Sequence, residues 1–280
     1  MDITQEITKE VFERYVPAAK MPERNSSVYN RLEVQFIAAY AMMVRTLVSP
    51  ECETALDSNE RLKKLAVHLV CIDAFVRTCR SLDLVLTATG FGIVSTESTA
   101  PASKSRVDAL VEEMGLQELD LIDEMIQELM KVEGWGLTEQ AQMRVPTLFY
   151  SPRQLKFMTT LKLSTDNWQL ARGRAVTASA LLRKEISDEY MDELLVKLRT
   201  DTLGNADVII MQKCCAFMAD FISMYDLSGG IPNELLLRQV VHQLESYRDN
   251  YPTYTGSTLY ARRHAERYQN RKEDPTFFFM

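Results

Sequence analysis

The chain has 280 residues, of which 46% are hydrophobic and 25% are charged, and its formal net charge is −7. This balance is typical of a globular protein with two domains or one large one, and it excludes collagen-like, low-complexity and wholly disordered chains. Because 39 acidic residues outnumber 32 basic ones, the surface as a whole repels nucleic acid and anionic lipid, which argues against a generic DNA-binding protein.

The sequence indicates neither a membrane span nor a disulfide framework. The most apolar run, from Leu65 to Val76, carries His68 and Asp73 and is shorter than the roughly 20 apolar residues that cross a bilayer. The number of cysteines is odd, and Cys214 and Cys215 are adjacent. We therefore expect no membrane contact, and cysteines that serve as small buried apolar residues in a reducing compartment.

Helical periodicity dominates the first 80 residues. Apolar residues recur at steps of three and four over 32–48 and over 59–80, which predicts two amphipathic helices. Between them, Ser49, Pro50 and Glu51 predict a helix start, because serine caps free amide groups and proline at the first position loses no hydrogen bond.

The hydrophobic period changes to two after residue 81. Apolar residues alternate over 82–87, and a second short run follows a break that contains Gly90. We therefore expect a β-hairpin at about 82–95, with Phe91 as a candidate contact residue.

Helical spacing returns after a polar loop. It predicts a helix over 103–114 that Gly115 ends, and a further helix whose apolar stripe runs over 119–129. The N-terminal helical module is thus expected to span 1–136, including the hairpin.

The second half of the sequence is also predicted to be mainly helical. Residues 137–152 contain two prolines and many turn formers, so we interpret them as a linker or an irregular crossing segment. A C-terminal helical module is predicted over 153–250, in which Ser187 restarts a helix and the nearly all-apolar stretch 208–225 is buried. The predicted fold class is mainly α: two helical-bundle modules, one short β-hairpin and an extended C-terminal tail.

A faint internal repeat accompanies this pattern. Residues 44–51 (VRTLVSPE) match 182–189 (LRKEISDE), and each segment precedes a helix and then a more apolar helix that contains cysteine. The recurrence indicates a duplicated module. Any two amphipathic helix pairs look alike at this level, so the sequence leaves open whether the chain is duplicated.

No catalytic, cofactor-binding or metal-binding site is predicted. The three histidines are isolated and form no HExxH or Cys-x-x-Cys pattern, and Gly90-Phe91-Gly92 lacks the remaining residues of a phosphate loop. The carboxylates between 112 and 128 have helix-surface spacing, which is typical of a solvated face. We therefore expect a protein that is not an enzyme and carries no cofactor.

The last 30 residues, 251–280, differ in composition from the rest of the chain. They are rich in aromatic residues, and between 262 and 272 five basic residues accompany one acidic residue. Three exposed phenylalanines would promote aggregation, so we expect them to be covered by this subunit or by a neighbour, with a disordered tail as the third alternative. The candidate interaction residues here are Arg262, Arg263, Arg267, Arg271, Phe277, Phe278 and Phe279.

Several segments resemble a family of uncharacterised proteins from phages and prophages of Bacteroidetes, including crAss-like phages. In the first half they are LDLVLTATGFGIVS (82–95) and TAPASKSRVDAL (99–110). In the second half they are LFYSP (148–152), RTDTL (199–203), YPTY (251–254), STLY (257–260) and RYQNRKEDPTFFF (267–279). None of these segments is a catalytic motif.

The resemblance implies a virion structural protein similar to head-tail connector proteins, also called adaptor or neck ring proteins. Such proteins are mainly helical and form rings below the portal. We therefore expect a homo-oligomeric ring in the virion neck, assembled in the bacterial cytoplasm. The expected partners are the portal and tail or other neck proteins, with packaged DNA in a channel without sequence specificity.

Other classes stay open at this point. They are another virion assembly protein (head-completion, tail-completion or tail-terminator), a cytoplasmic helical enzyme, and a nucleic-acid-binding assembly factor.

Overall fold

The computed structural model describes residues 1–19, 27–81, 84–87, 90–93 and 103–265. These residues are mainly helical, which confirms the predicted fold class. The helices of the first half are α1 (Ile3–Glu6), α2 (Lys9–Tyr15), α3 (Ser27–Met43), α4 (Ala55–Ser58), α5 (Glu60–Cys79), α6 (Lys104–Leu129) and α7 (Glu139–Arg144). Those of the second half are α8 (Pro152–Met158), α9 (Thr165–Ile186), α10 (Asp188–Arg199), α11 (Asn205–Ser228), α12 (Glu234–Ser246), α13 (Pro252–Thr255) and α14 (Thr258–Arg263).

Shorter elements complete the description. Strands β1 (Leu84–Thr87) and β2 (Gly90–Ile93) pair antiparallel within the segment expected to form a hairpin. The 3₁₀ turns cover Pro17–Ala19, Pro50–Cys52, Trp135–Leu137 and Arg248–Asn250, and a π-helical turn covers Val44–Val48.

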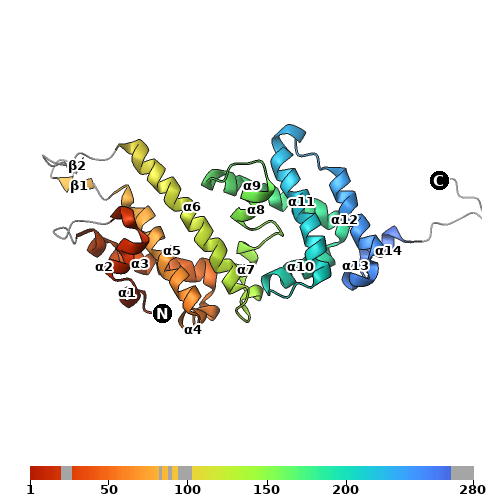
Figure 1. The fold of residues 1–280 in the computed structure, drawn as a ribbon, viewed down its shortest axis with the longest axis horizontal. Helices are drawn as coiled ribbons and strands as arrows, with labels where there is room; N and C mark the ends of the chain where they lie inside the picture. The colour runs from red at the N-terminus through yellow and green to blue at the C-terminus, as the bar shows by residue number, and fades with distance from the viewer. Residues whose placement is uncertain (20–26, 82–83, 88–89, 94–102, 266–280) are drawn as a thin grey trace, which may run out of the picture.

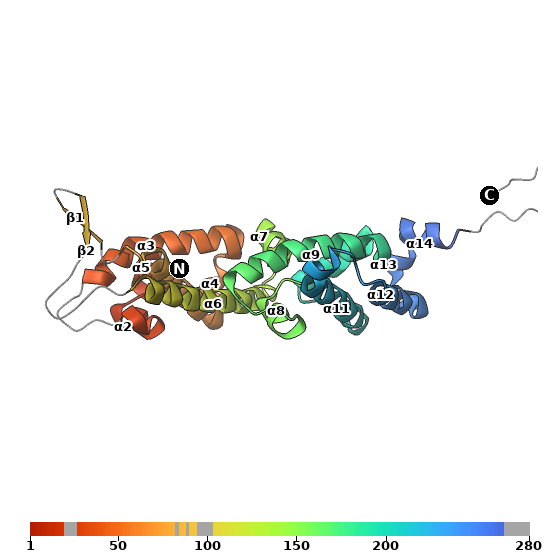
Figure 2. The same cartoon turned by 90° about the horizontal axis from the view of Figure 1, so that it is seen from above.

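The helices form two bundles that follow one another along the long axis of the molecule (Figures 1 and 2). We call residues 8–144, from α2 to α7, module 1, and residues 151–263, from α8 to α14, module 2. The buried apolar side chains of both modules belong to one continuous core. The two modules are therefore packed against each other and are not joined by an exposed linker.

In module 1, helix α5 is central and packs against α2, α3 and α6. It begins where the side chain of Asn59 accepts hydrogen bonds from the backbone amides of Arg61 and Leu62, at 3.0 and 3.2 Å. These bonds satisfy amides that have no partner inside the helix.

In module 2, helix α11 takes the central place and packs against α8, α9 and α12. One side of it is fully buried, including Cys214 and Phe217, while Ile209 and Met224 on another side are exposed. By length and hydropathy α11 meets the criterion for a membrane span, and 44% of its most apolar window is buried. Within the described residues, α3 and α4 with their intervening turns meet that criterion only as a pair bent by 99°.

The two modules repeat the same order of elements. Each has a seven-residue helix capped by Thr8 or Ser151, a long helix, a serine with positive φ, and a central helix followed by an amphipathic one. The two serines, Ser49 and Ser187, both have φ 78° and both cap the following helix or turn.

The long helices α3 and α9 share the same buried positions. The amide of Ser49 donates to the carbonyl of Val44, five residues back, whereas the amide of Ser187 donates to Arg183, four residues back. The π-helical turn thus accommodates one extra residue in module 1. With that residue allowed for, four buried positions align at constant spacing: Leu32, Phe36, Ala39 and Met43 with Ala171, Ala175, Ala178 and Leu182.

Each module also ends in a matched six-residue helix. Thr138 caps α7 and bonds to the carbonyl of Trp135, and Ser257 caps α14 and bonds to the carbonyl of Tyr254, so a buried aromatic residue stands three positions before each cap. These correspondences favour the duplicated-module alternative that the sequence left open.

Three boundary predictions need correction. Gly115 does not end a helix, because α6 continues through it. The segment 137–152, interpreted as a linker or an irregular crossing segment, is not a linker, since it contains α7 and the buried residues Val145 and Leu148. The predicted extended tail is folded up to Arg263, because Tyr251 and Tyr254 are buried against Tyr190.

Candidate functional site

The predicted interaction residues fall in different places. The strand register places Phe91 opposite Leu86. Arg262 is exposed on α14, whereas Arg263 donates to the backbone carbonyl of Glu185 at 2.6 Å and pairs with its carboxylate. Arg263 therefore contacts this chain's own module 2. The other predicted residues, Arg267, Arg271, Phe277, Phe278 and Phe279, lie outside the described residues.

A surface that the sequence did not single out is the contact between the modules. We call it the seam: the edge of module 1 formed by α6 and α7, with the edge of module 2 formed by α8 and α9 covering it. At its centre, Asp123 of α6 is 1% exposed. Its Oδ2 accepts a hydrogen bond from Gln127 at 3.0 Å and faces Arg153 Nε of α8 at 3.3 Å.

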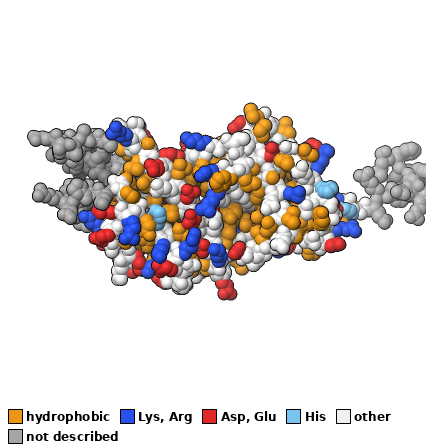
Figure 3. Space-filling model, in the orientation of Figure 1, with side chains coloured by type: hydrophobic (Ala, Val, Ile, Leu, Met, Phe, Trp, Pro, Cys, Tyr) orange, Lys and Arg blue, Asp and Glu red, His pale blue; other side chains and the backbone are white. Residues whose placement is uncertain are grey.

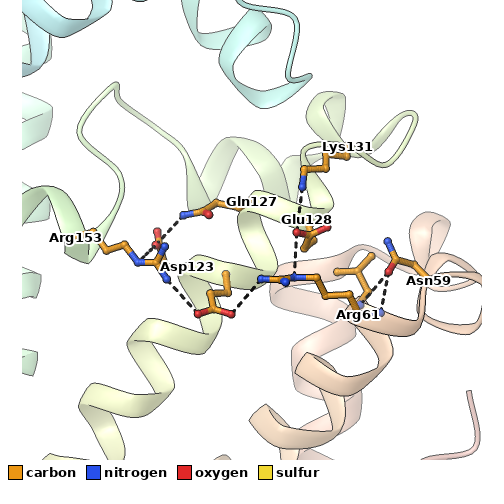
Figure 4. A network of polar contacts seen from close by, with 9 residues as sticks. Asn59, Arg61, Asp123, Gln127, Glu128, Lys131 and Arg153 are labelled. Atoms are coloured by element: carbon orange, nitrogen blue, oxygen red, sulfur yellow. Dashed lines mark hydrogen bonds and ion pairs between the residues drawn. The ribbon is translucent and has the colours of Figure 1, made fainter.

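The charged groups beside Asp123 form a chain along α6 (Figure 4). Glu124 pairs with Arg153 of module 2 at 3.1 Å and with Arg61 of α5 at 3.6 Å. Arg61 also pairs with Glu128 at 3.1 Å. The carboxylates of this stretch therefore join α5, α6 and α8, and the expected fully solvated face is wrong for Asp123, because α8 covers it.

Further polar contacts fix the start of α9 on α6 and α7. The hydroxyl of Thr165 donates to Glu112 at 2.9 Å, and Arg172 Nη2 donates to the carbonyl of Met143 at 3.1 Å. Gly115 lets the two helices approach, since a Cβ on it would lie 3.1 Å from Cγ2 of Thr165. Trp168 of α9 is 6% exposed in the same contact.

Burial in the seam shifts the pKa of two carboxyl groups. Desolvation raises the pKa of Asp123, although the Ser151 hydroxyl and the Arg153 charge partly oppose this. Desolvation also raises the pKa of Glu118, with a further contribution from Asp73. Both carboxyl groups therefore hold their proton more strongly at this interface than they would in water.

A second, open groove lies on module 2. We call it the end groove; it lies between α9, α12 and α14 and has a volume of about 740 Å³, against about 210 Å³ left in the seam. Its lining residues are Leu181, Lys184, Glu185, Pro232, Glu234, Leu237, Arg238, Val241, His242, Glu245 and Arg263.

The end groove occupies the same place in module 2 as the seam does in module 1. Met125 and Leu129 of α6 correspond to Val240 and Leu244 of α12, and all four are fully buried. In this alignment the residues of α6 that line the seam are equivalent to residues of α12 that line the end groove. The arginines that end α7 and α14 are also equivalent. The pairs are Leu119 with Glu234, Ile122 with Leu237, Asp123 with Arg238, Ile126 with Val241, and Arg144 with Arg263.

The seam and the end groove differ in whether other residues cover them. In the seam, Pro152 and Trp168 of module 2, and Tyr150 just before it, lie against α6. In the end groove no described residue takes that place, and Leu237 and Val241 are only half-buried.

Exposed apolar side chains gather close to α12. Leu227 is 81% exposed, Ile231 73% and Leu235 65%, all at the turn from α11 to α12. Figure 3 shows hydrophobic side chains at this turn, at the top of module 2. Uncovered apolar groups of this size mark a surface for protein contacts.

The nucleophilic and metal-ligating side chains do not converge. Among the described residues, no three His, Cys, Asp or Glu side chains are grouped so as to hold a metal ion. Burial raises the pKa of the Cys71 and Cys215 thiols to about 12. His68 stacks on Tyr15, with ring centroids 4.2 Å apart, and burial lowers its pKa. These residues act in packing.

Comparisons with known proteins give one match. Residues 26–144 match a family model described as a family of unknown function (DUF6712). No curated protein and no solved structure matches the chain. The matched range begins one residue before α3 and ends on the last residue of α7, so the chain is similar to this family over nearly the whole of module 1.

Proposed function

We propose that this chain is a phage virion structural protein, the subunit of a head-tail connector ring that joins portal to tail by protein contacts. The observation that carries the proposal is an apolar surface of module 2 that no described residue covers, namely the end groove and the turn from α11 to α12. Each apolar side chain buried there on assembly contributes about 1.5–3 kcal/mol.

The architecture supports the same function. Two modules share one core and are joined by a seam in which Arg153 pairs with the buried Asp123, which suits a rigid wedge in a ring. The resemblance to phage connector proteins supports a position of that ring in the virion neck.

Electron microscopy of the purified full chain, alone and with the portal, tests the proposal. We expect closed rings that bind the portal. A chain that stays monomeric at all concentrations, with and without portal, contradicts it.

The tail gives a second test. Deleting the last six residues, 275–280, is expected to abolish ring assembly while the circular dichroism spectrum of the body stays unchanged, because the phenylalanines act as a clamp. Truncated chains that form rings and infectious particles contradict the clamp.

A further inference from the structure

Among the described residues, the repeat leaves one edge at each end of the molecule with no other module packed against it, although α1 lies beside α3. Within the chain, the α6–α7 edge of module 1 receives the α8–α9 edge of module 2. The element that corresponds to α8–α9 in module 1 is α2–α3, and the element that corresponds to α6–α7 in module 2 is α12–α14. These two edges lie at opposite ends of the long axis (Figure 2). A second copy could therefore continue the same contact.

The charges of the two free edges are complementary. The seam pairs Arg153 of α8 with Asp123 of α6. The position that corresponds to Arg153 is Glu10, two residues after the cap of α2, and the position that corresponds to Asp123 is Arg238 of α12. Both signs are reversed, so the pair between copies is again attractive. Glu10 and Arg238 are both exposed, and within the described part of the chain Arg238 pairs with the exposed Glu234 of its own helix.

A second pair shows the same relationship. In the seam, Arg172 of α9 reaches Met143 of α7. The positions that correspond to these residues are Glu33 of α3 and Arg262 of α14, both exposed. At two independent positions, therefore, the α2–α3 edge carries an acidic residue and the α12–α14 edge carries a basic one.

An aromatic residue belongs to the same edge as the two acidic residues. Trp168, which covers α6 in the seam, corresponds to Tyr29 of α3. Tyr29 is half-buried: its ring centroid lies 6.3 Å from that of Phe12 of α2, and its hydroxyl donates to the carbonyl of Ile7. The α2–α3 edge therefore combines an aromatic ring with two carboxylates.

We propose that the end groove binds the α2–α3 edge of a second copy of this chain, by the same packing that joins the two modules within one chain. The contact is head-to-tail, so that each copy uses its α12–α14 edge and its α2–α3 edge toward different neighbours. Such an interface closes into a ring or continues as a filament. The inference rests on the proposed self-assembly and names its interface.

Charge reversal tests this interface in the full-length protein. Glu10→Arg and Arg238→Glu, made singly, are each expected to raise the concentration of half-assembly about tenfold or more, measured by mass photometry and sedimentation velocity. The double variant is expected to restore assembly. Glu113→Arg and Arg106→Glu, which reverse exposed charges on α6, serve as matched controls and are expected to assemble as the unmodified chain does.

Cross-linking supplies a readout that a folding defect cannot imitate. Chains that carry Glu10→Cys are mixed with chains that carry Arg238→Cys under oxidising conditions. We expect a disulfide-linked dimer from the mixture only, and none from the unmodified chain.

The outcomes separate the two proposals. Rings that form normally from both single reversals, or the absence of the mixed disulfide, overturn the head-to-tail interface but leave the connector function intact, because another surface or the chain's own tail then covers the groove. A chain that never assembles overturns both.

Discussion

Arg263 contacts Glu185 twice, through the backbone carbonyl at 2.6 Å and through the carboxylate. Arg144 contacts Thr46 in the same two ways, with Nε 2.9 Å from the carbonyl and Nη2 3.0 Å from the hydroxyl. The last carbonyls of a long helix have no partner inside the helix, and a cation is favoured there. Each module thus ends by folding an arginine back onto the C-terminal turn of its long helix.

Removing either arginine is expected to destabilise the protein. Arg144→Ala leaves the Thr46 carbonyl without its donor in a poorly solvated site, so we expect a loss of about 1–3 kcal/mol in the free energy of unfolding. Arg263→Ala is expected to cost less, because its site is more exposed. Urea denaturation measures both, and Arg262→Ala, on the exposed neighbour of Arg263, is the control. Equal stability of the Arg144 variant and the unmodified chain would contradict this role.

These arginines show why part of the architecture was not predictable. Helices that bury a regular apolar stripe, such as α5 and α9, follow from local spacing, and Ser187 follows from capping chemistry. The six-residue helix α7 carries no such stripe, and it is stabilised by contacts with residues almost a hundred positions earlier. Spacing alone therefore indicated a linker there.

Trp135 provides a second long-range link within module 1. Its side chain is fully buried, and Nε1 donates to the carbonyl of Leu47 at 3.0 Å. Trp135→Phe keeps most of the ring volume but leaves that carbonyl unsatisfied, so we expect a loss of about 1–3 kcal/mol. Urea denaturation followed by far-UV circular dichroism, which depends on neither tryptophan, measures it. Trp168→Phe is the control and should cost less; the reverse order would show that the hydrogen bond is unimportant.

The seam was hidden from the sequence for an electrostatic reason. A run of carboxylates at helix spacing indicates a solvated face, and that prediction is right for Asp120, which is exposed. Asp123 is buried because Arg153, thirty residues later, covers it. One sequence signal indicates this contact. Arg153 lies two positions after the cap Ser151, at the start of a short helix next to the proposed module boundary, where a basic side chain can reach the other module.

The pKa of Glu118 predicts a pH-dependent stability. Burial raises it above 4.5, assisted by Asp73 and opposed by Arg77 and Arg144. The contribution of protonated Glu118 is fully present below about pH 4.5 and is lost as the pH rises through the folded-state pKa. Glu118→Gln keeps the neutral form, so we expect it to be more stable than the unmodified chain at pH 7 and equal to it near pH 4.

Urea denaturation at both pH values checks this difference. Glu113→Gln, at an exposed position of the same helix, is expected to have no effect at either pH. A Glu118→Gln variant that is less stable at pH 7 would show that the attraction of the charged carboxylate to Arg77 and Arg144 outweighs the cost of burial.

Two glycines give a matched pair for the contact between the modules. A Cβ on Gly136 would lie 2.5 Å from the carbonyl oxygen of Arg199, at the end of α10, whereas a Cβ on Gly173 of α9 would meet nothing within 4 Å. Gly136→Ala must push the backbone of module 2 away from module 1, so we expect a loss of about 1–3 kcal/mol or more. Gly173→Ala only lowers the flexibility of the unfolded chain and favours helix, so we expect a gain of about 0.5–1 kcal/mol in the free energy of unfolding.

Thermal unfolding of the two variants measures the difference. A Gly136→Ala variant as stable as the unmodified chain would mean that α10 is not held against module 1, and a rigid two-module subunit would no longer follow.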